Sequence, residues 1–359
     1  MNKKIIFSAG GTGGHLFPAL HLMDYFSENG YEVLLVTDKR GKNFIKNSTK
    51  YKVHVLNVET FTNKNFFKKI LSFFIILYSL VRSIFILKKE KPNLIFGLGG
   101  YVSFPISLVS KFFNLPLVIY ENNAILGRAN KYLSFFAKRI LCSKDIKENF
   151  TEKYKNKTYF VGSILNKNIL NFEENCEYNK KGVFSILILG GSQGAEIFGN
   201  VIPPVIKMLK EAGNKIKVYQ QCLKKQKNEI INFYEKNNIE NYIFEFEEDI
   251  FKLILSSDLA ITRCGASTTE ELIHALTPFV AIPLPNSIDN HQYLNAKYYE
   301  KRGCCWIIKQ DNCNAENLFN LIIKNIKNEN ELVNIRKNMK KNKNKNVYNN
   351  IEKLIKDFV

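Results

Sequence analysis

Four of the five residues from 10 to 14 are glycine, and a histidine closes the segment: Gly10-Gly11-Thr12-Gly13-Gly14-His15. The short apolar run Ile5 to Phe7 precedes it, and a stretch typical of a helix, Pro18 to Asn29, follows. Glycines at such a turn let backbone N–H groups approach an anion, and the helix N-terminus adds its positive dipole end. The segment predicts a phosphate or diphosphate site. A turn that needs glycine for steric reasons alone explains one or two of these glycines, but hardly four.

Two common nucleotide motifs are excluded at this loop. A dinucleotide fingerprint would need glycine or alanine where Leu16 stands, although Asp38 lies about where such an enzyme holds its ribose. The lysine followed by serine or threonine that a P-loop requires is also missing. The anion is therefore expected to belong to another kind of ligand.

His15 is a candidate general base. The positive end of a helix dipole disfavours the charged form of a histidine, so the imidazole would be neutral and able to accept a proton. The alternative is a helix-start residue that only hydrogen-bonds the backbone. We favour the catalytic role because of the neighbouring loops.

Further polar and glycine-rich segments follow other apolar runs. They are Gly97-Leu98-Gly99-Gly100-Tyr101-Val102-Ser103, Glu121-Asn122-Asn123 and Gly190-Gly191-Ser192-Gln193-Gly194. Ligands of α/β proteins bind at the carboxyl ends of parallel strands. The first two segments and the loop at 10–15 are therefore expected to form one composite site.

The elements that must position these loops follow a repeating pattern. Short runs rich in β-branched residues, bounded by Gly, Asn or Pro, alternate with helical stretches, as in an α/β fold with parallel strands buried on both faces. The expected strands are Ile5–Phe7, Val33–Val36, Leu94–Phe96, Leu117–Tyr120, Phe184–Leu189, Ile216–Tyr219, Leu259–Thr262 and Phe279–Ile282. Two halves that each open with strand, glycine loop and helix predict two Rossmann-like parallel-sheet domains facing a central cleft.

Composition narrows the class of partner. The 359 residues suffice for about two domains, and 45% hydrophobic with 24% charged residues excludes wholesale disorder. The net charge of +19 favours nucleic acid, an anionic membrane or a phosphorylated substrate. No interleaving of Arg and aromatic residues marks a base-stacking surface, so nucleic acid is not expected. Seven scattered cysteines without C-x-x-C spacing indicate a cytosolic chain with free thiols, and the N-terminus does not predict a signal peptide.

Residues 70–87, ILSFFIILYSLVRSIFIL, are the most apolar stretch of the chain. Their length is at the lower limit for crossing a bilayer, and Arg82 would be costly there, so a spanning helix is disfavoured. The flanking lysines are typical of a helix at the surface of an anionic membrane. The expected contact residues are Lys68, Lys69, Phe73, Phe74 and Ile75. A crossover helix with one face on the sheet is the other interpretation, and both can hold at once.

Six ordered motifs run along the chain: GGTGGH at 10–15, GLGGYVSFP at 97–105, ENNAILGRANK at 121–131, LGGSQGA at 189–195, RCGASTTEEL at 263–272 and PLPNSIDNHQYLNA at 283–296. They resemble those of the MurG family, the bacterial N-acetylglucosaminyltransferases that make lipid II in peptidoglycan synthesis. The resemblance covers the chain from Lys3 to about Trp306, and their order and spacing make it specific.

The resemblance implies a GT-B fold with an acceptor and membrane-associating domain at 1–161, a donor domain at 162–340, and a C-terminal helix at 341–359 that packs back on the first domain. It also implies transfer of N-acetylglucosamine from UDP-GlcNAc to the 4-hydroxyl of the muramoyl sugar of lipid I. The reaction would proceed with inversion, without metal or other cofactor. The implied location is peripheral, on the cytoplasmic face of the bacterial inner membrane.

Site residues follow from the same motifs. The general base would be His15, with Glu121 as the alternative, and the family pattern leaves this choice open. Acceptor diphosphate loops would contain Gly11, Gly99, Gly100 and Tyr101. Donor-binding positions would be Thr12, Gly13, Gly14, Asn123, Asn166, Ser192, Glu247, Ala266, Ser267, Thr268, Thr269, Glu270, Glu271 and Gln292. Among these, Glu271 would accept hydrogen bonds from both ribose hydroxyls, a geometry that suits a carboxylate.

The chain departs from the family pattern at three of these places. Asn166 stands where the family has an arginine at the donor phosphate, and Lys167 beside it supplies charge without the fork of a guanidinium. His291 replaces the first of two glutamines, and Glu247 replaces an apolar residue near the uracil. The first change affects the expected donor affinity rather than the reaction type.

Other interpretations stay open at the level of sequence. A different GT-B glycolipid transferase or a UDP-sugar epimerase would share the fold, although an epimerase would not need the apolar, basic segment at 64–91. A non-catalytic UDP-sugar-binding scaffold would be compatible with the missing arginine. Turnover with labelled UDP-GlcNAc and a lipid I analogue distinguishes a scaffold from an enzyme.

Overall fold

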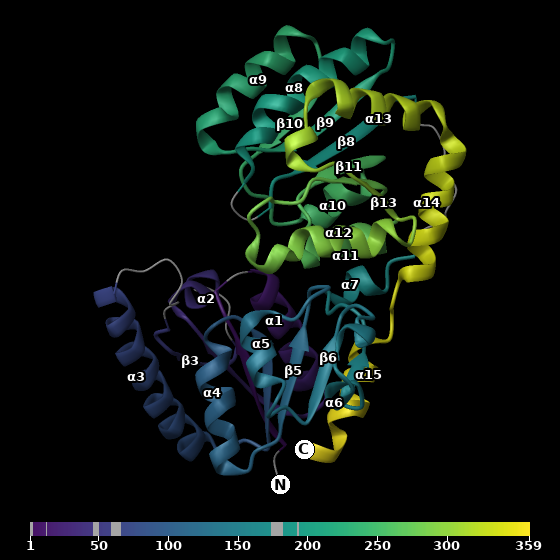
Figure 1. The fold of residues 1–359 in the computed structure, drawn as a ribbon. Coiled ribbons are helices and arrows are strands. Elements are labelled where there is room, and N and C mark those ends of the chain that lie inside the picture. Colours follow the sequence, from purple (N-terminus) through teal and green to yellow (C-terminus); the bar gives the residue numbers. More distant parts are fainter. Residues whose placement is uncertain (1–2, 12, 46–49, 59–65, 174–181, 192–193) are drawn as a thin grey trace. The chain divides into compact units, whose positions relative to one another are not determined.

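A computed structural model describes residues 3–11, 13–45, 50–58, 66–173, 182–191 and 194–359, except the side chains of 66–71 and 149. The chain divides into two compact units (Figure 1). Unit 1 contains Met1–Asn166 and Asn344–Val359, and unit 2 contains Lys167–Lys343. The divisions expected after residues 161 and 340 lie a few residues before these boundaries.

Unit 1 is built on a parallel sheet with the strand order β3-β2-β1-β4-β5-β6-β7. Its strands are β1 Lys4–Ala9, β2 Glu32–Thr37, β3 Lys52–Val55, β4 Leu94–Gly99, β5 Leu117–Glu121, β6 Arg139–Cys142 and β7 Thr158–Phe160. The central strands are buried along nearly their whole length, as apolar runs covered on both faces must be.

The helices of unit 1 connect these strands. They are α1 Gly13–Glu28, α2 Lys39–Phe44, α3 Phe66–Glu90, α4 Ser103–Ser110, α5 Arg128–Leu133 and α6 Glu152–Lys155, with 3-10 turns η1 Lys111–Phe113 and η2 Lys147–Asn149. Helix α1 begins at Gly13, before the expected start at Pro18. The second pair of glycines is therefore the first turn of the helix rather than part of the loop.

The C-terminal segment packs on unit 1. It consists of α15 Val347–Ile355 and the 3-10 turn η6 Lys356–Phe358. The Tyr348 ring stacks on Tyr25 with centroids 4.9 Å apart, and the Tyr25 hydroxyl donates to Glu352 at 2.7 Å. At the end of the chain, Asp357 pairs with Arg139 at 2.9 Å. These contacts join the last residues to the first domain in the sequence.

Unit 2 contains a second parallel sheet, with the order β10-β9-β8-β11-β12-β13. Its strands are β8 Phe184–Leu189, β9 Ile216–Gln221, β10 Glu240–Phe244, β11 Leu259–Thr262, β12 Phe279–Ala281 and β13 Cys305–Ile307. Its helices are α7 Lys167–Leu170, α8 Glu196–Glu211, α9 Lys227–Lys236, α10 Ile250–Leu255, α11 Ala266–Ala275, α12 His291–Glu300, α13 Ala315–Lys327 and α14 Glu329–Asn342, with 3-10 turns η3 Lys224–Gln226, η4 Ile288–Asn290 and η5 Gln310–Asn312.

The two faces of this sheet hold separate apolar cores. Alternate residues of β8 point to opposite faces. Ile186 and Ile188 pack in the cluster that includes residues of α8 and α13, whereas Leu187 and Leu189 pack in the cluster that includes residues of α11 and α12. Helices cover both faces, which is the doubly wound arrangement. The two parallel sheets confirm the predicted α/β class, and every strand expected from the sequence is present.

Candidate active site

The first two glycine loops of unit 1 lie against each other at the carboxyl ends of β1 and β4. The Gly10 amide donates to the Gly99 carbonyl at 3.1 Å. Gly99 and Gly100 have φ of +101° and +79°, and a Cβ on Gly100 would lie 2.8 Å from the Gly10 Cα. Both the backbone conformation and the close approach therefore require glycine. The two sequence motifs form one backbone surface.

The His15 side chain packs directly on this surface. It comes from the first turn of α1, and a Cβ added to Gly99 would lie 2.9 Å from the His15 Nδ1. The imidazole is half-buried. Glycine at position 99 thus leaves the space that the ring occupies, and it fixes the ring beside the second loop.

A proline and an asparagine join the third loop to the first. Pro18 lies inside α1 and has no N–H, so the Gly14 carbonyl four residues earlier lacks its helical donor. The Asn122 side-chain amide lies 3.3 Å from this carbonyl and donates to it. The loop after β5 is thereby held against the start of α1. Sequence reasoning missed this role of Asn122, although the proline inside the helix is a signal that could have pointed to it.

Glu121 is buried and is surrounded by hydrogen-bond donors. One carboxylate oxygen accepts from the backbone N–H and the side-chain amide of Asn123, both at 3.0 Å. The other accepts from the Gly127 N–H at 2.8 Å and from the Asn130 side chain at 2.9 Å. A general base needs a lone pair directed at the substrate, and four donors already occupy this carboxylate. The arrangement favours Glu121 as the residue that shapes the loop and orients Asn123.

The remaining predicted residues of unit 1 lie at the same loops or at their edges. Tyr101 follows Gly100 and is half-buried, and Gly11 is buried. Asp38 caps the short helix α2, where its Oδ1 accepts from the Gly41 N–H at 2.8 Å. Thr12 lies outside the residues that the structure describes.

In unit 2 the glycine loop after β8 leads into α8. Gly191 and Gly194 have φ of +80° and +70°, and the Gly190 N–H donates to the Gln221 side chain at 3.0 Å. Ser192, the predicted phosphate ligand of this loop, lies outside the described part of the chain. Gly191 is half-buried, and the positive φ values of Gly191 and Gly194 are backbone conformations that favour glycine.

Arg263 fastens the loops of unit 2 to one another. Its guanidinium donates to the Ile282 carbonyl at 3.0 Å and to the Gln310 side chain at 2.6 Å. It also lies 5.1 Å from the centre of the Phe198 ring. Because the side chain is buried and its donors are engaged, Arg263 holds the loop after β11 in place beneath the surface.

The predicted donor-binding residues of helix α11 fall into two groups, one that faces the interior and one that is partly exposed. Glu270 and Thr269 point inward, where the Tyr299 hydroxyl donates to Glu270 and Thr269 bonds the Gly265 carbonyl. Ala266 is buried as well, whereas Ser267, Thr268 and Glu271 are half-buried. Burial raises the pKa of the Glu271 carboxyl to about 7. The two adjacent glutamates therefore have different roles, and Glu271 is the one at the surface of the helix.

Gln292 bridges two loops at the start of α12. Its Oε1 accepts from the Cys264 N–H at 3.2 Å and from the Leu284 N–H at 3.0 Å. With both bonds on the oxygen, the amide nitrogen is oriented away from these backbone groups. His291 instead turns its Nδ1 to the Ile288 carbonyl at 2.8 Å. Of this pair, Gln292 is the residue whose side chain is held by the backbone of two other loops.

The other predicted donor ligands are more peripheral. The carboxylate of Glu247 accepts from the hydroxyl of Tyr242, a residue of β10, at 3.0 Å. Asn166 and Lys167 are exposed at the boundary between the units. Among the described residues, no group of three His, Cys, Asp or Glu side chains is arranged to hold a metal ion.

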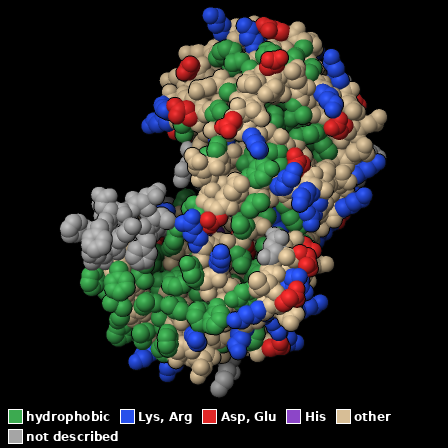
Figure 2. All heavy atoms as spheres, viewed as in Figure 1, with side chains coloured by type: hydrophobic (Ala, Val, Ile, Leu, Met, Phe, Trp, Pro, Cys, Tyr) green, Lys and Arg blue, Asp and Glu red, His purple; other side chains and the backbone are tan. Residues whose placement is uncertain are grey.

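Helix α3 has its large apolar residues on the outside. Phe73 and Phe74 are 57% and 58% exposed, while Ser72, Ser79 and Ser83 are fully buried. Further exposed residues of the helix are Leu77, Tyr78, Val81 and Phe85. Apolar side chains gather over this helix in the space-filling view (Figure 2). Ile75 is half-buried, and the side chains of Lys68 and Lys69 lie outside the described ones.

None of the described helices combines the length and the apolar character needed to cross a bilayer. The buried serines explain how α3 still packs. The Ser79 and Ser83 hydroxyls bond carbonyls within α3 at 2.8 and 2.7 Å, and small side chains allow close contact with α4. The helix is therefore a crossover between β3 and β4 that keeps an unusually apolar outer face.

Comparison with known proteins assigns both units to one glycosyltransferase family. The N-terminal domain model of glycosyltransferase family 28 matches residues 5–142, and its C-terminal domain model matches residues 185–354. The UDP-N-acetylglucosamine–N-acetylmuramyl-(pentapeptide) pyrophosphoryl-undecaprenol N-acetylglucosamine transferase of Pelagibacter ubique is 36% identical over 98% of this chain and 97% of its own length. The protein of the same name from Rickettsia canadensis is 37% identical over 94% of both chains.

Solved structures show the same relationship. The crystal structure of Acinetobacter baumannii MurG is similar with a TM-score of 0.82 at 25% identity, over 99% of this chain and all of the other. A putative UDP-N-acetylglucosamine 2-epimerase from Listeria monocytogenes has a TM-score of 0.70 at 14% identity, which reflects a common fold alone. The two-domain GT-B architecture expected from the sequence is confirmed.

Proposed function

The chain belongs to glycosyltransferase family 28, and from this membership we infer that it transfers N-acetylglucosamine from UDP-GlcNAc to the muramoyl sugar of lipid I, giving lipid II. The enzyme is a hexosyltransferase. One observation supports this inference at the level of residues. Two glycine loops contact each other and His15 at the sheet edge where α/β proteins bind their ligands.

We assign the acceptor to this edge of unit 1. The lipid I diphosphate would lie along the backbone of the loops at Gly11, Gly99 and Gly100, where the absence of side chains on the glycines and the start of α1 favour an anion. His15 would accept the proton of the acceptor 4-hydroxyl. The hydroxyl oxygen then forms a bond to C1 of N-acetylglucosamine as the bond from C1 to the UDP oxygen breaks, which inverts the configuration at C1.

Glu121 has a positioning role in this proposal. Its four hydrogen bonds fix the loop after β5 and direct the Asn123 side chain. A single base is sufficient for the reaction, since the leaving diphosphate is already anionic. His15, which contacts the loop surface, is better placed than a carboxylate enclosed by donors.

We assign the donor to the loops of unit 2. Glu271 would accept hydrogen bonds from the ribose hydroxyls, and the Gln292 amide nitrogen would donate to hydroxyls of the sugar. The first turn of α11 and the glycine loop that follows β8 would supply backbone N–H groups for the diphosphate. Glu270 and Thr269, which face the interior, support α11 rather than touch the donor. Asn166 lacks the charge of the family's arginine, so we expect weaker binding of the diphosphate.

The exposed face of α3 is proposed to rest on the membrane. Its aromatic and aliphatic side chains would enter the lipid headgroup boundary, and the lysines around the helix would meet anionic lipids. An acceptor with an undecaprenyl chain is confined to that membrane. The protein is therefore expected to act as a peripheral enzyme at the cytoplasmic face of the bacterial inner membrane.

A transfer assay with labelled UDP-GlcNAc tests this function. Lipid I should accept the label in a β-linkage, and an equal concentration of free muramoyl peptide without the diphosphate should accept far less. Binding of UDP-GlcNAc without any transfer would identify a scaffold and refute the proposal. Conversion of the donor to its 2-epimer without an acceptor would identify an epimerase.

A further inference from the structure

An arginine lies over the first glycine loop without forming part of any sequence motif. A Cβ added to Gly11 would lie 2.5 Å from the Arg40 Nε and 2.6 Å from its Nη2. The guanidinium therefore rests on the backbone of the loop, at the position where a side chain on residue 11 would project. Arg40 and the Asp38 carboxylate fill the space that a side chain on the buried Gly11 would enter.

The guanidinium is held at one side and open at the other. Asp38 accepts from the Gly41 N–H through Oδ1 and from the Arg40 Nη2, at 3.1 Å, through Oδ2. The Asp38 side chain is 10% exposed, whereas that of Arg40 is 68% exposed. One edge of the fork is thus anchored, and the exposed remainder can donate to a ligand. An anchored fork loses less conformational entropy on binding than a free side chain.

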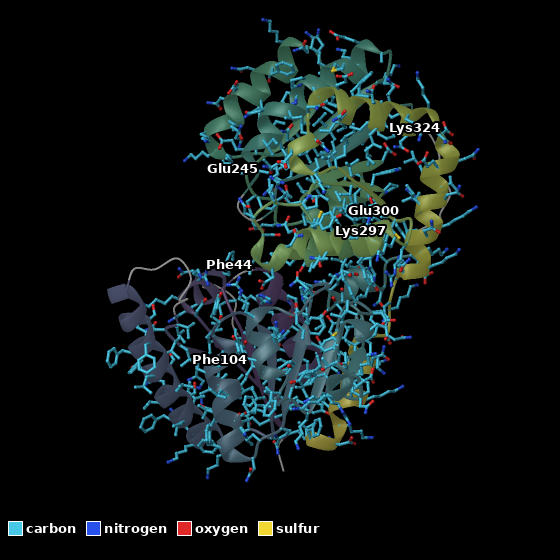
Figure 3. All side chains as sticks on the ribbon, in the orientation of Figure 1. Phe44, Phe104, Glu245, Lys297, Glu300 and Lys324 are labelled. Carbon is cyan, nitrogen blue, oxygen red and sulfur yellow. The ribbon has the colours of Figure 1, made fainter. Side chains whose placement is uncertain are left out.

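Two exposed aromatic rings project from α1, which follows the glycine loop, and from α2, which carries Arg40. Phe17 from α1 is 47% exposed and covers Gly13, whose added Cβ would lie 2.9 Å from the ring. Phe44 ends α2 (Figure 3) and is 56% exposed. The two rings meet edge to face with centroids 6.4 Å apart. Arg40 and Phe44 are four residues apart on α2 and so project from the same face of the helix.

A polyprenyl diphosphate joins a charged group directly to an apolar chain. A surface that recognises this junction must place hydrogen-bond donors for the phosphate next to apolar side chains for the first isoprenoid units. Arg40 above the glycine loop supplies the donors, and the Phe17–Phe44 pair supplies the apolar part. Asp38 also faces this place, but its carboxylate oxygens are occupied by the Gly41 amide and by Arg40 itself.

We propose that Arg40 binds the lipid-side phosphate of the acceptor and that the Phe17–Phe44 pair packs on its first isoprenoid units. This inference rests on the proposed function, because it names how the same enzyme recognises the lipid end of its acceptor. The backbone loops would hold the diphosphate as a whole. Arg40 and the rings would select a diphosphate that carries an apolar chain.

The first experiment measures steady-state kinetics of Arg40→Gln and Arg40→Lys with lipid I as acceptor. Loss of hydrogen bonds to a charged group should raise the acceptor KM about 10- to 100-fold in Arg40→Gln, with the donor KM unchanged. Arg40→Lys should give a smaller increase, since it keeps the charge without the fork. Lys42→Gln is the matched control, an exposed cation on the same helix that projects from another face. Equal acceptor KM values for Arg40→Gln and Lys42→Gln would overturn the role of Arg40.

The second experiment compares two acceptors, lipid I with an isoprenoid chain and an analogue whose diphosphate ends in a methyl group. Phe44→Ser should raise the KM several-fold for the first acceptor and leave it unchanged for the second. Arg40→Gln should weaken both acceptors. Phe160→Ser, which removes an exposed ring on the edge strand β7 of unit 1, is the control. A Phe44→Ser effect of equal size on both acceptors, or on neither, would overturn the role of the rings.

The wild-type enzyme separates failure of this inference from failure of the proposed function. If the wild type transfers no sugar to lipid I, the proposed function falls. If the wild type is active and the Arg40 and Phe44 variants match their controls, only the proposed roles of Arg40 and of the Phe17–Phe44 pair are refuted. Donor binding by each variant, measured by calorimetry with UDP-GlcNAc, shows that the variant is folded.

Discussion

At the scale of residues, hydrogen bonding distinguishes the two side chains that the sequence offered as alternatives for the general base. Glu121 is the last residue of β5 and His15 lies in the first turn of α1, and either could be a base by residue type. The donors around Glu121 come from residues two to nine positions further along the chain, in a loop whose path no local pattern specifies. Only the folded loop reveals that this carboxylate is already fully engaged.

Glu121→Gln tests the positioning role. The substitution places an N–H₂ group against donors and should cost about 1–3 kcal/mol in unfolding free energy. We expect the melting temperature to fall by at least a few degrees. Glu148→Gln is the control. Glu148 is exposed, and its ion pair with Lys155 contributes little to the stability of the fold. A melting temperature for Glu121→Gln equal to that of the control would contradict the positioning role and restore Glu121 as a candidate base.

Glu271 should give donor binding a pH dependence. Burial raises the pKa of its carboxyl to about 7, so the group is mostly protonated at pH 6 and mostly charged at pH 8. Ribose hydroxyls donate to the charged form, and UDP-GlcNAc affinity should therefore increase about tenfold between these pH values. The diphosphate diester of the donor does not titrate in this range.

Calorimetry at pH 6 and pH 8 measures this effect, with Glu271→Gln as the comparison. The variant should bind more weakly than the wild type at pH 8 and show little dependence on pH. A wild type whose affinity is as flat as that of the variant would refute the ribose contact. Glu270→Gln tests the neighbouring, buried glutamate. Loss of its hydrogen bond with Tyr299 should lower the stability of the fold.

The neighbouring glutamates also show where sequence reasoning stops. The motif at 263–272 indicates a ligand-binding helix start, but it names Glu270 and Glu271 together. Their separation depends on which side of α11 meets Tyr299, a residue of another helix. Such a partner, distant in sequence, cannot be found from local spacing.

At the scale of elements, α3 is unusual because it buries serines and exposes aromatic residues. A crossover helix normally does the reverse, since burial of apolar area stabilises the fold. The apolar stretch at 70–87 predicted a helix with excess hydrophobic surface. The sequence could not show which residues lie outside, because the stretch is apolar on nearly every side.

Membrane binding by α3 has a direct test in vesicle flotation. Phe73→Ser combined with Phe74→Ser should reduce association with vesicles that contain phosphatidylglycerol, since two exposed rings are removed from the interface. Phe246→Ser and Tyr242→Ser together form the control, as exposed rings in unit 2. Unchanged flotation of the α3 variant would exclude this helix as the membrane contact.

Four of the five strands that sequence reasoning missed share a physical cause. All four edge strands, β3, β7, β10 and β13, were absent from the predicted set, as was β6. An edge strand pairs on one side only and is partly exposed, so it needs no continuous apolar run. Apart from β6, which is only four residues long, the central strands were predictable because burial on both faces demands such a run.

At the scale of the whole molecule, the chain passes between its units twice, at residues 166–167 and 343–344. The last helix returns to unit 1 and contributes to its core through Val347, Ile351 and Ile355. Unit 1 is therefore built from two segments that are distant in the sequence. The excess of 52 Lys and Arg over 33 Asp and Glu suits an enzyme whose proposed acceptor and membrane are both anionic.

The central claim is that His15 activates the acceptor at the paired glycine loops. Single-turnover transfer from labelled UDP-GlcNAc to lipid I, compared between the wild type and His15→Ala, tests it most directly. We predict at least a 100-fold lower rate for the variant, as expected for loss of a general base, with unchanged affinity for UDP-GlcNAc. A variant that transfers the sugar at the wild-type rate would contradict the account.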